Sequence, residues 1–341
     1  METGRARCRT PDAVVMTEPA DPDIRLLRAR DRAAAPIDYR RMRIHLTSGA
    51  ATRVAPGAFA PTSHWQKLKP IDQHLVRVRE AMARSQSELV LSHLSAAARW
   101  GIDILGLWPQ RVDTRIERAT GGRASGLLRR YAWGLDGVDV ADWEGHLVTT
   151  PAQTVVDLAA VLSYTSAVIV MDQALWARRK GGALATRADI ERVLQRSAPA
   201  RGIRKIERAF EFATALSDSV RESQSRVVIA ELGFPAPVLQ HPIRLLDGRW
   251  VRPDFYFADF DHAAEFDGVG KYLDPDLLQG RTPEQALVAE KDRADALARV
   301  VSTLSRWRTP ALRDPRKLYD ILVAAELQTP KLRPPRGVVW Q

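Results

Sequence analysis

The last third of the chain follows an order of elements that few architectures can accommodate. Residues 219–232 have the spacing of a helix, and three β-prone runs follow before the helical pattern returns. The elements expected after this helix are strands over 236–245, 249–257 and 262–268, a helix over 282–301, a strand over 302–307 and a helix over 314–327. An α-β-β-β-α-β-α order, with a sheet of mixed direction and helices on both faces, belongs to the α/β layer architectures.

Two neighbouring strands in this region separate apolar from acidic side chains. Successive side chains of a strand point to opposite faces, so Asp254 in the run WVRPDFYF (250–257) lies opposite the phenylalanines of that run. In HAAEFDG (262–268), Glu265 and Asp267 also face away from the apolar residues. If both phenylalanine faces join the core and the connecting loop has an even number of residues, the three carboxylates converge on the other face. An odd loop places Asp254 opposite a phenylalanine instead.

Three carboxylates on one face repel one another, so a cation is their expected companion. Oxygen ligands alone favour Mg²⁺ or Mn²⁺, and such an ion can activate water and stabilise the charge of a phosphodiester during its cleavage. We therefore predict a metal site held by Asp254, Glu265 and Asp267. Lys271, which follows Asp267 past two glycines, is expected to orient the water or to offset phosphate charge.

These residues resemble the motif of the restriction-endonuclease-like superfamily, a Pro-Asp pair followed by (D/E)-x-K on the next strand. Residues 253–254 (Pro-Asp) and 265–267 (Glu-Phe-Asp) match it in order and spacing, with Asp267 in place of the lysine. With this aspartate the motif resembles that of a subgroup related to very-short-patch repair endonucleases, whose pattern is E-x-D-G-x-x-H. Gly268 fits that pattern, and Lys271 stands where the histidine would be.

The same resemblance implies two further site residues. The family has an acidic residue on the preceding helix, here Glu222, and an arginine-bearing helix after the motif, here Arg293, which would contact DNA. The activity implied is that of a metal-dependent endodeoxyribonuclease. Its catalytic residues would be Glu222, Asp254, Glu265, Asp267 and Lys271.

Each of these residues also has a purely structural interpretation. Glu222 fits a capping box, because Ser219 to Glu222 has the S-x-x-E form. The strand carboxylates fit a solvated polar face, and Arg293 fits a surface salt bridge. The run Thr282-Pro283-Glu284-Gln285 is typical of a helix start and is assigned no chemistry.

Charge is distributed unevenly along the chain. The formal net charge of +10 divides into +7 for residues 1–87, with 16 Lys/Arg and 9 Asp/Glu, +3 for 88–215, with 17 and 14, and zero for 216–341, with 18 and 18. A basic excess makes polyanions the first partners to consider. Its position indicates a module at the front of the chain that contacts double-stranded DNA. The arginines expected to reach DNA there are Arg40, Arg41, Arg43 and Arg53.

The same front region has the local pattern of a winged helix. Residues 38–48 are expected to form a helix that stops at Gly49. ATRVAPGAFAP then forms two short β-prone runs around Pro56-Gly57, which predicts a hairpin. A basic helical hairpin with a solvated face is the alternative interpretation.

The middle of the chain predicts a mixed α/β region followed by helices. The wing-like run, then LSHLSAAARWGI and later VTTPAQTVVDLAA resemble, in that order, the type IV toxin-antitoxin antitoxins of the abortive-infection AbiEi class. The resemblance implies a winged helix joined to a larger domain that assists operator binding and toxin neutralisation. We interpret His93 as a structural or interface histidine and Asp157 as a buried hydrogen-bonding residue. The matching residues are Arg53, Gly57, Ser92, His93, Ser95, Thr150, Thr154 and Asp157.

The compartment and the domain limits follow from these patterns. One cysteine, Cys8, allows no internal disulfide, which fits a reducing cytoplasm. The strongest apolar stretch, 155–177, contains Asp157 and Asp172, so buried helices rather than a membrane span are expected there. The start of translation is left open between Met1 and Met16. The domains expected are a tail (1–19), a winged helix (20–70), an antitoxin-like α/β domain (71–165), a helical connector (166–215), a restriction-endonuclease-like domain (216–330) and a tail (331–341).

Two functions follow. The chain is expected to be an α/β multidomain bacterial DNA-binding protein, antitoxin-like or regulator-like, whose C-terminal domain cleaves DNA with Mg²⁺ or Mn²⁺. The alternative is a non-catalytic antitoxin or repressor whose nuclease-like domain only binds DNA or a partner. In either case a cognate toxin is a candidate partner.

Overall fold

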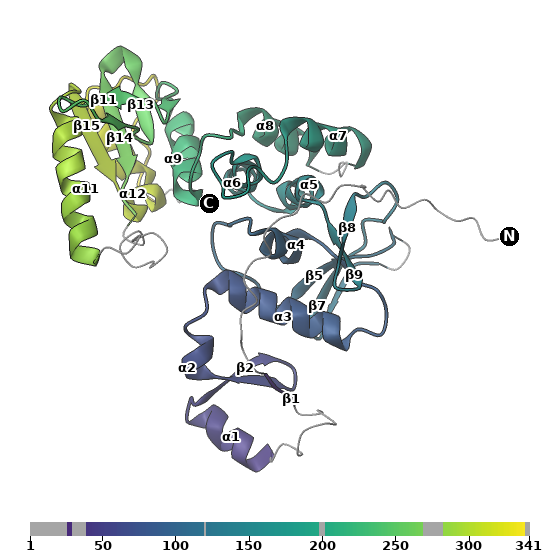
Figure 1. The fold of residues 1–341 in the computed structure, drawn as a ribbon. Helices are drawn as coiled ribbons and strands as arrows, with labels where there is room; N and C mark the ends of the chain where they lie inside the picture. Colours follow the sequence, from purple (N-terminus) through teal and green to yellow (C-terminus); the bar gives the residue numbers. More distant parts are fainter. Residues whose placement is uncertain (1–25, 29–38, 119–120, 198–201, 269–281, 338–341) are drawn as a thin grey trace. The chain divides into compact units, whose positions relative to one another are not determined.

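The protein is an α/β chain of two compact units, Met1–Ala213 and Thr214–Gln341. The computed structural model describes residues 26–28, 39–118, 121–197, 202–268 and 282–337 (Figure 1). Within these ranges, no helix has both the length and the apolar character needed to cross a bilayer. Each unit is described separately below.

The first unit begins with a small antiparallel sheet and one helix. Its elements are β1 (Leu27–Arg28), α1 (Tyr39–Thr47), β2 (Ala51–Ala55) and β3 (Ala58–Pro61), with sheet order β1-β3-β2. The helix and hairpin predicted from the sequence are both present. Gly49 after α1 (φ +74°) and Gly57 in the hairpin (φ +69°) adopt the left-handed conformation that favours glycine.

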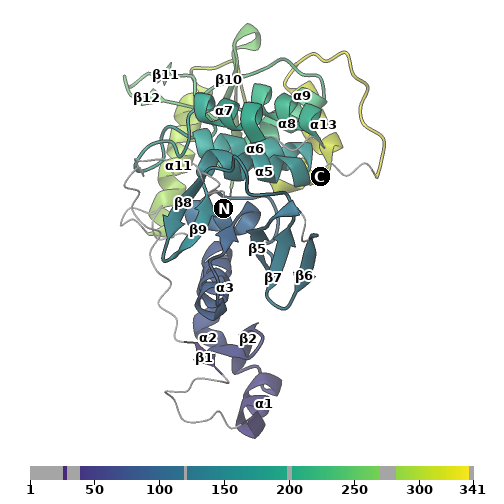
Figure 2. The ribbon, with the colours of Figure 1, turned by 90° about the vertical axis from the view of Figure 1, so that its right-hand side faces the viewer.

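Two helices connect this sheet to the rest of the unit. They are α2 (Thr62–Trp65) and α3 (Pro70–Arg84). Val76 of α3 packs with Val54, Ala60 and Trp65 in a small core under the hairpin. Leu75 and other residues of α3 pack in a second core, with residues of the sheet that follows in the chain. α3 therefore contacts both β2 and β5, a strand of that second sheet (Figure 2).

A six-stranded mixed sheet forms the middle of the first unit. Its order is β6-β7-β5-β4-β9-β8, with β4/β9 and β5/β7 parallel and the other pairs antiparallel. Its strands are β4 (Val90–Leu91), β5 (Val112–Arg115), β6 (Arg123–Ser125), β7 (Leu128–Tyr131), β8 (Val140–Trp143) and β9 (His146–Thr149). The mixed α/β character predicted for this region is confirmed.

Helices complete the first unit. They are α4 (His93–Trp100), α5 (Pro151–Val161), α6 (Tyr164–Leu175), α7 (Arg187–Ser197) and α8 (Ile203–Phe212). Asp157 and Asp172 are fully buried on α5 and α6, as expected for buried helices. α6 to α8, expected as a connector, contact α5 or one another and belong to the first unit.

The second unit has the predicted succession of helices and β segments, but two of the predicted strands are divided and the short helix α12 precedes the last helix. Its main sheet has the order β10-β13-β14-β15, in which β14 and β15 are parallel, and β11 and β12 form a separate ribbon. Its elements are α9 (Val220–Glu231), β10 (Val238–Leu239), β11 (Ile243–Arg244), β12 (Trp250–Val251), β13 (Phe255–Phe257), the 3₁₀ helix η2 (Ala258–Phe260), β14 (His262–Phe266), α11 (Pro283–Ala298), β15 (Thr303–Trp307), α12 (Thr309–Arg313) and α13 (Pro315–Ala324).

The predicted strand over 249–257 is in fact two strands of different sheets. Pro253 has no N–H group to give to a ladder, so the chain leaves the ribbon after Val251 and joins the main sheet at Phe255. The run 236–245 is divided in the same way, around Pro242.

Both faces of the main sheet are covered by helices (Figure 1). Phe255, Phe257 and Phe266 pack with residues of α9, α12 and α13 in the larger core. Ala263 packs on the other side with Leu297 of α11 in a smaller one. The phenylalanines therefore share one core, as the alternation predicted.

Candidate functional site

An exposed helix stands at the front of the first unit. Met42 of α1 is buried, whereas the side chains that follow it through Ala50 are exposed. The exposed side chains include the apolar Ile44 and Leu46. α1 therefore offers most of its surface to solvent or to a partner.

The segment that contains α1 and the hairpin has one sign of charge. Residues 39–71 include six Lys/Arg and no Asp/Glu. Arg43 and Arg53 are exposed, and neither has an ion-pair partner among the described residues. The backbone of Arg40 and Arg41 lies in the first turn of α1, but their side chains lie outside what the structure describes. We refer to α1 with the β2–β3 hairpin as the α1–wing surface.

Glu222 lies at the start of α9 and close to Asp254. Ser219 Oγ accepts a hydrogen bond from Glu222 N (3.2 Å) and donates one to Glu222 Oε1 (2.8 Å). Glu222 Oε2 accepts from Asp218 N (2.9 Å) and from Gln240 Nε2 (3.4 Å). Burial, together with the charge of Asp254, raises the pKa of Glu222 to about 8. Ser219 and Glu222 thus form the helix cap that the sequence indicated, and the catalytic role of Glu222 stays a prediction.

Asp254 lies in the bend directly before β13. Its Oδ2 accepts a hydrogen bond from Phe266 N at 2.8 Å, which extends the β13–β14 ladder by one side-chain bond. The loop 258–261 between these strands has four residues, the even number that the prediction required. The same register, continued by one residue, sets Asp254 opposite Glu265.

Glu265 is engaged by two arginines. Its Oε1 accepts from Arg293 Nη2 (2.7 Å), and its Oε2 accepts from Arg306 Nε (3.1 Å) and Nη2 (2.6 Å). Both guanidinium groups also bind Glu290. Burial lowers the pKa of Arg293, but hydrogen bonds to Glu290 and Glu265 outweigh it and raise the pKa above its ordinary value. Arg293, expected to contact DNA, thus forms a salt bridge, which was the alternative interpretation.

Asp267 has a similar partner. It follows β14, and its Oδ2 accepts from Arg308 Nε (2.8 Å) and Nη2 (2.6 Å). Lys271, the remaining residue of the predicted catalytic set, lies outside the described residues.

The structure does not assemble the three carboxylates as free metal ligands. Among the described residues, no group of three or more His, Cys, Asp or Glu side chains is placed to hold a metal ion. Arginines bind Glu265 and Asp267, and the charge of Asp254 acts on Glu222, whose pKa it raises together with burial. Two carboxylates with waters and a substrate phosphate are enough for Mg²⁺, so this pair fits the ion in donor type.

The signal for the arginine partners was present in the sequence but was missed. Arg306 lies on β15 and Arg308 follows its last residue in extended backbone, so the two side chains point to the same side. β15 pairs in parallel with β14 after the α11 crossover, and the register sets Arg306 beside Glu265. The R-x-R spacing next to E-x-D could have predicted the pairing, once a parallel register was assumed.

Several residues that match the antitoxin resemblance, among them Ser92, His93 and Asp157, make buried polar contacts. Ser92 Oγ and His93 Nδ1 are 2.9 Å apart, and the His93 ring stacks on Tyr131 with centroids 3.6 Å apart. Burial lowers the pKa of His93 well below its usual value, so the ring is neutral. Asp157 is bound by Arg115 Nη1 at 2.7 and 2.9 Å. Both residues have the structural role predicted for them.

No protein-family model matches the chain. Two curated proteins of Mycobacterium tuberculosis, from strains CDC 1551/Oshkosh and ATCC 25618/H37Rv and both described as uncharacterized, are 32% identical to it over 139 residues. The match includes 40% of this chain and 49% of each relative, so the chain spans about half the length of the curated relatives it matches.

Proposed function

We propose that the protein is a cytoplasmic bacterial DNA-binding protein of the antitoxin or transcriptional-regulator type, which contacts double-stranded DNA through the α1–wing surface. The observation that carries the proposal is an exposed helix followed by a hairpin, in a segment of 33 residues (39–71) with six basic and no acidic side chains. The resemblance to AbiEi-class antitoxins supports it and adds a cognate toxin as the protein partner. The mycobacterial relatives support a bacterial source.

The geometry suits the duplex. A helix with its side chains is about 10–12 Å across, and the major groove is about 12 Å wide. α1 would enter the groove, and Arg53 on the adjacent hairpin would reach the phosphate backbone. The arginines of α1 would then supply both phosphate contacts and base contacts.

Arg43→Gln is expected to weaken DNA binding and to flatten its salt dependence. One lost phosphate contact lowers the slope of log K against log salt by up to about 0.9, and the variant Arg40→Gln/Arg41→Gln/Arg43→Gln lowers it by up to about 2.7. The measurement is duplex binding by fluorescence anisotropy at salt concentrations from about 50 to about 200 mM, a range over which phosphate contacts change the affinity strongly.

Arg204→Gln is the matched control for that measurement. Arg204 is also an exposed helical arginine with no ion-pair partner among the described residues, but it lies on α8. Equal slopes for wild type, Arg43→Gln and the triple variant would reject the α1–wing surface as the DNA interface.

A second candidate function is metal-dependent cleavage of DNA by the second unit. The pair Glu222 and Asp254 supports it, since a carboxylate at the start of α9 and one directly before β13 could hold Mg²⁺ or Mn²⁺ with a substrate phosphate. The metal would supply charge stabilisation at the phosphodiester. The engagement of Glu265 and Asp267 by arginines favours the non-catalytic alternative, in which this unit binds DNA or a partner.

Cleavage of supercoiled DNA with Mg²⁺ or Mn²⁺ separates these alternatives. If the second unit is a nuclease, Asp254→Asn and Glu222→Gln cleave at least about 10²-fold more slowly than wild type, because each removes a carboxylate from the pair that would hold the metal. Asp259→Asn, an exposed aspartate on the neighbouring 3₁₀ helix, is the control and should cleave like wild type. Absence of cleavage by wild type, or equal cleavage by all variants, would reject the nuclease function and leave DNA binding as the only proposed function.

A further inference from the structure

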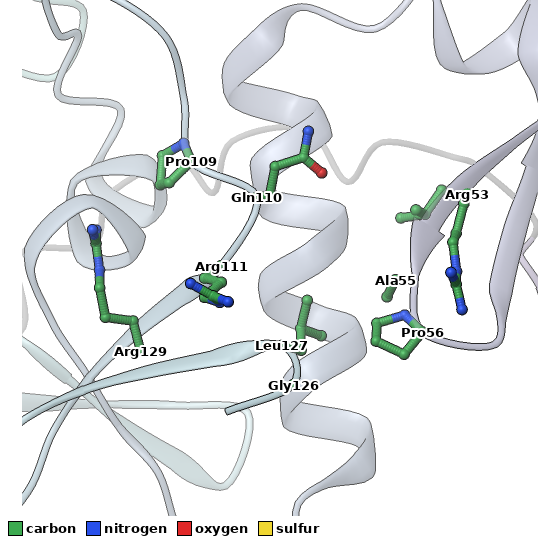
Figure 3. A pocket seen from close by; sticks show the side chains of 10 residues that line it. Arg53, Ala55, Pro56, Pro109, Gln110, Arg111, Gly126, Leu127 and Arg129 are labelled. Atoms are coloured by element: carbon green, nitrogen blue, oxygen red, sulfur yellow. The ribbon is translucent and has the colours of Figure 1, made fainter. Parts of the chain in front are cut away.

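A pocket of about 410 Å³ opens within the first unit, beside the hairpin of the α1–wing surface (Figure 3). It is lined by the end of β2, by the segment that precedes β5, and by the β6–β7 turn with the start of β7. The walls between its polar groups are apolar and include Ala55, Pro56 and Leu127. This combination of a concave apolar wall and few polar groups is typical of ligand sites.

Three arginines and no acidic residue contribute to the lining. Arg53, Arg111 and Arg129 come from three separate segments, and in Figure 3 the side chain of Arg111 lies between the other two. Arg53 and Arg111 are exposed and have no ion-pair partner in the part of the chain that the structure describes. Gln110 adds an uncharged polar group.

Arg129 is fixed by an ion pair with Asp113. Its Nε donates to Asp113 Oδ1 (2.6 Å) and its Nη2 to Asp113 Oδ2 (2.8 Å), and Asp113 itself is fully buried. This bidentate pair fixes one edge of the guanidinium and leaves Nη1 available to a ligand. A fixed guanidinium loses little side-chain entropy when it binds, so the pocket is partly organised in advance.

We propose that this pocket binds a phosphate group. Guanidinium forks match phosphate oxygens in geometry, and a dianion offsets the charges of Arg53 and Arg111, which have no ion-pair partner among the described residues. The phosphate belongs either to the DNA backbone beside the wing or to a free phosphorylated small molecule. Arg53 is shared with the proposed DNA interface, whereas Arg111 belongs to the pocket alone, so Arg111 separates this inference from the proposed function.

The experiment uses the full chain and two measurements. The first is thermal unfolding in inorganic phosphate against chloride at equal ionic strength, in which wild type is expected to gain stability in phosphate and Arg111→Gln to lose that gain. The second is the salt dependence of duplex binding, in which Arg111→Gln is expected to lower the slope by up to about 0.9 if the phosphate is that of DNA. Arg204→Gln is the control, and Arg111→Lys, which keeps the charge without the fork, should fall between wild type and Arg111→Gln.

The outcomes are distinguishable. Loss of the phosphate effect with an unchanged DNA slope assigns the pocket to a free phosphorylated ligand, and a lowered slope assigns it to the DNA backbone. Arg111→Gln equal to wild type in both measurements, or Arg204→Gln changed as much as Arg111→Gln, overturns the proposal. Because the thermal unfolding measurement contains no DNA, it tests the pocket even if the α1–wing surface proves not to bind DNA. Equal unfolding temperatures of the variants in chloride verify that they fold.

Discussion

Replacing Asp157 by alanine is expected to lower the free energy of unfolding of the first unit by about 3 to 5 kcal/mol. Asp157 is fully buried on α5. Both of its carboxylate oxygens accept hydrogen bonds from Arg115 Nη1, and its Oδ1 also accepts one from Gln153 Nε2 at 2.9 Å. Arg115 is 4% exposed and also donates Nε to Gly134 O at 2.7 Å. Removal of the carboxylate leaves a guanidinium inside the protein without its counter-charge, which costs more than the loss of a surface pair.

The measurement is urea unfolding of the full chain followed by tryptophan fluorescence, since Trp133 lies 5.9 Å from the Arg115 guanidinium. Asp136→Ala, an exposed aspartate in the same unit, is the matched control and should change stability by no more than about 0.5 kcal/mol. The double variant Asp157→Leu/Arg115→Met removes both charges and should recover much of the loss. A loss below about 1 kcal/mol for Asp157→Ala would contradict the interpretation.

The second unit is expected to lose stability as the pH rises from 5 to 9 in metal-free buffer. Burial and the charge of Asp254 raise the pKa of Glu222 to about 8, from an ordinary value of 4.5. A carboxyl whose folded pKa is raised stabilises the fold fully below its unfolded pKa, and this contribution is lost as the pH rises through the folded pKa. The total loss is of the order of 3 to 5 kcal/mol, since one pH unit of difference corresponds to about 1.4 kcal/mol.

Glu222→Gln should remove most of that pH dependence. Glutamine keeps an oxygen for the hydrogen bond from Asp218 N and carries no charge to repel Asp254. The variant is therefore expected to melt at a higher temperature than wild type at pH 9 and at a similar temperature at pH 5. Asp259→Asn, on the same unit but exposed, should follow wild type at every pH. A wild-type melting temperature that stays constant from pH 5 to 9 would contradict the raised pKa.

Element type was predictable from the sequence because local signals were strong. The capping box at Thr282 starts α11 as expected, with the Thr282 side chain and Gln285 exchanging bonds with the backbone. Gly49 follows α1 in the left-handed conformation that a helix end requires. Strand limits were less predictable, because prolines inside β-prone runs, such as Pro253, transfer the chain from one sheet to another.

The candidate site was predictable only in part, for a physical reason. Strand alternation and loop length are local, and they predicted that Asp254 and Glu265 share one face, which the register confirms. The partners of the carboxylates are non-local, since Arg306 and Arg308 each lie 41 residues beyond the acid they bind. Alternation within two strands cannot reveal a third strand that brings arginines to the same place. Glu222 was identified by its capping form and by resemblance, but its raised pKa depends on tertiary burial.

The order of strands in the first unit also determines when its six-stranded sheet can be completed during synthesis. β4 is only two residues long and lies between β5 and β9, so it gains its second neighbour only when residues 146–149 have left the ribosome. At about 5 to 20 residues per second, the 58 residues from Leu91 to Thr149 take roughly 3 to 12 seconds to make. Throughout that interval at least one edge of β4 is unpaired, and β5 is its first pairing partner before β9 arrives.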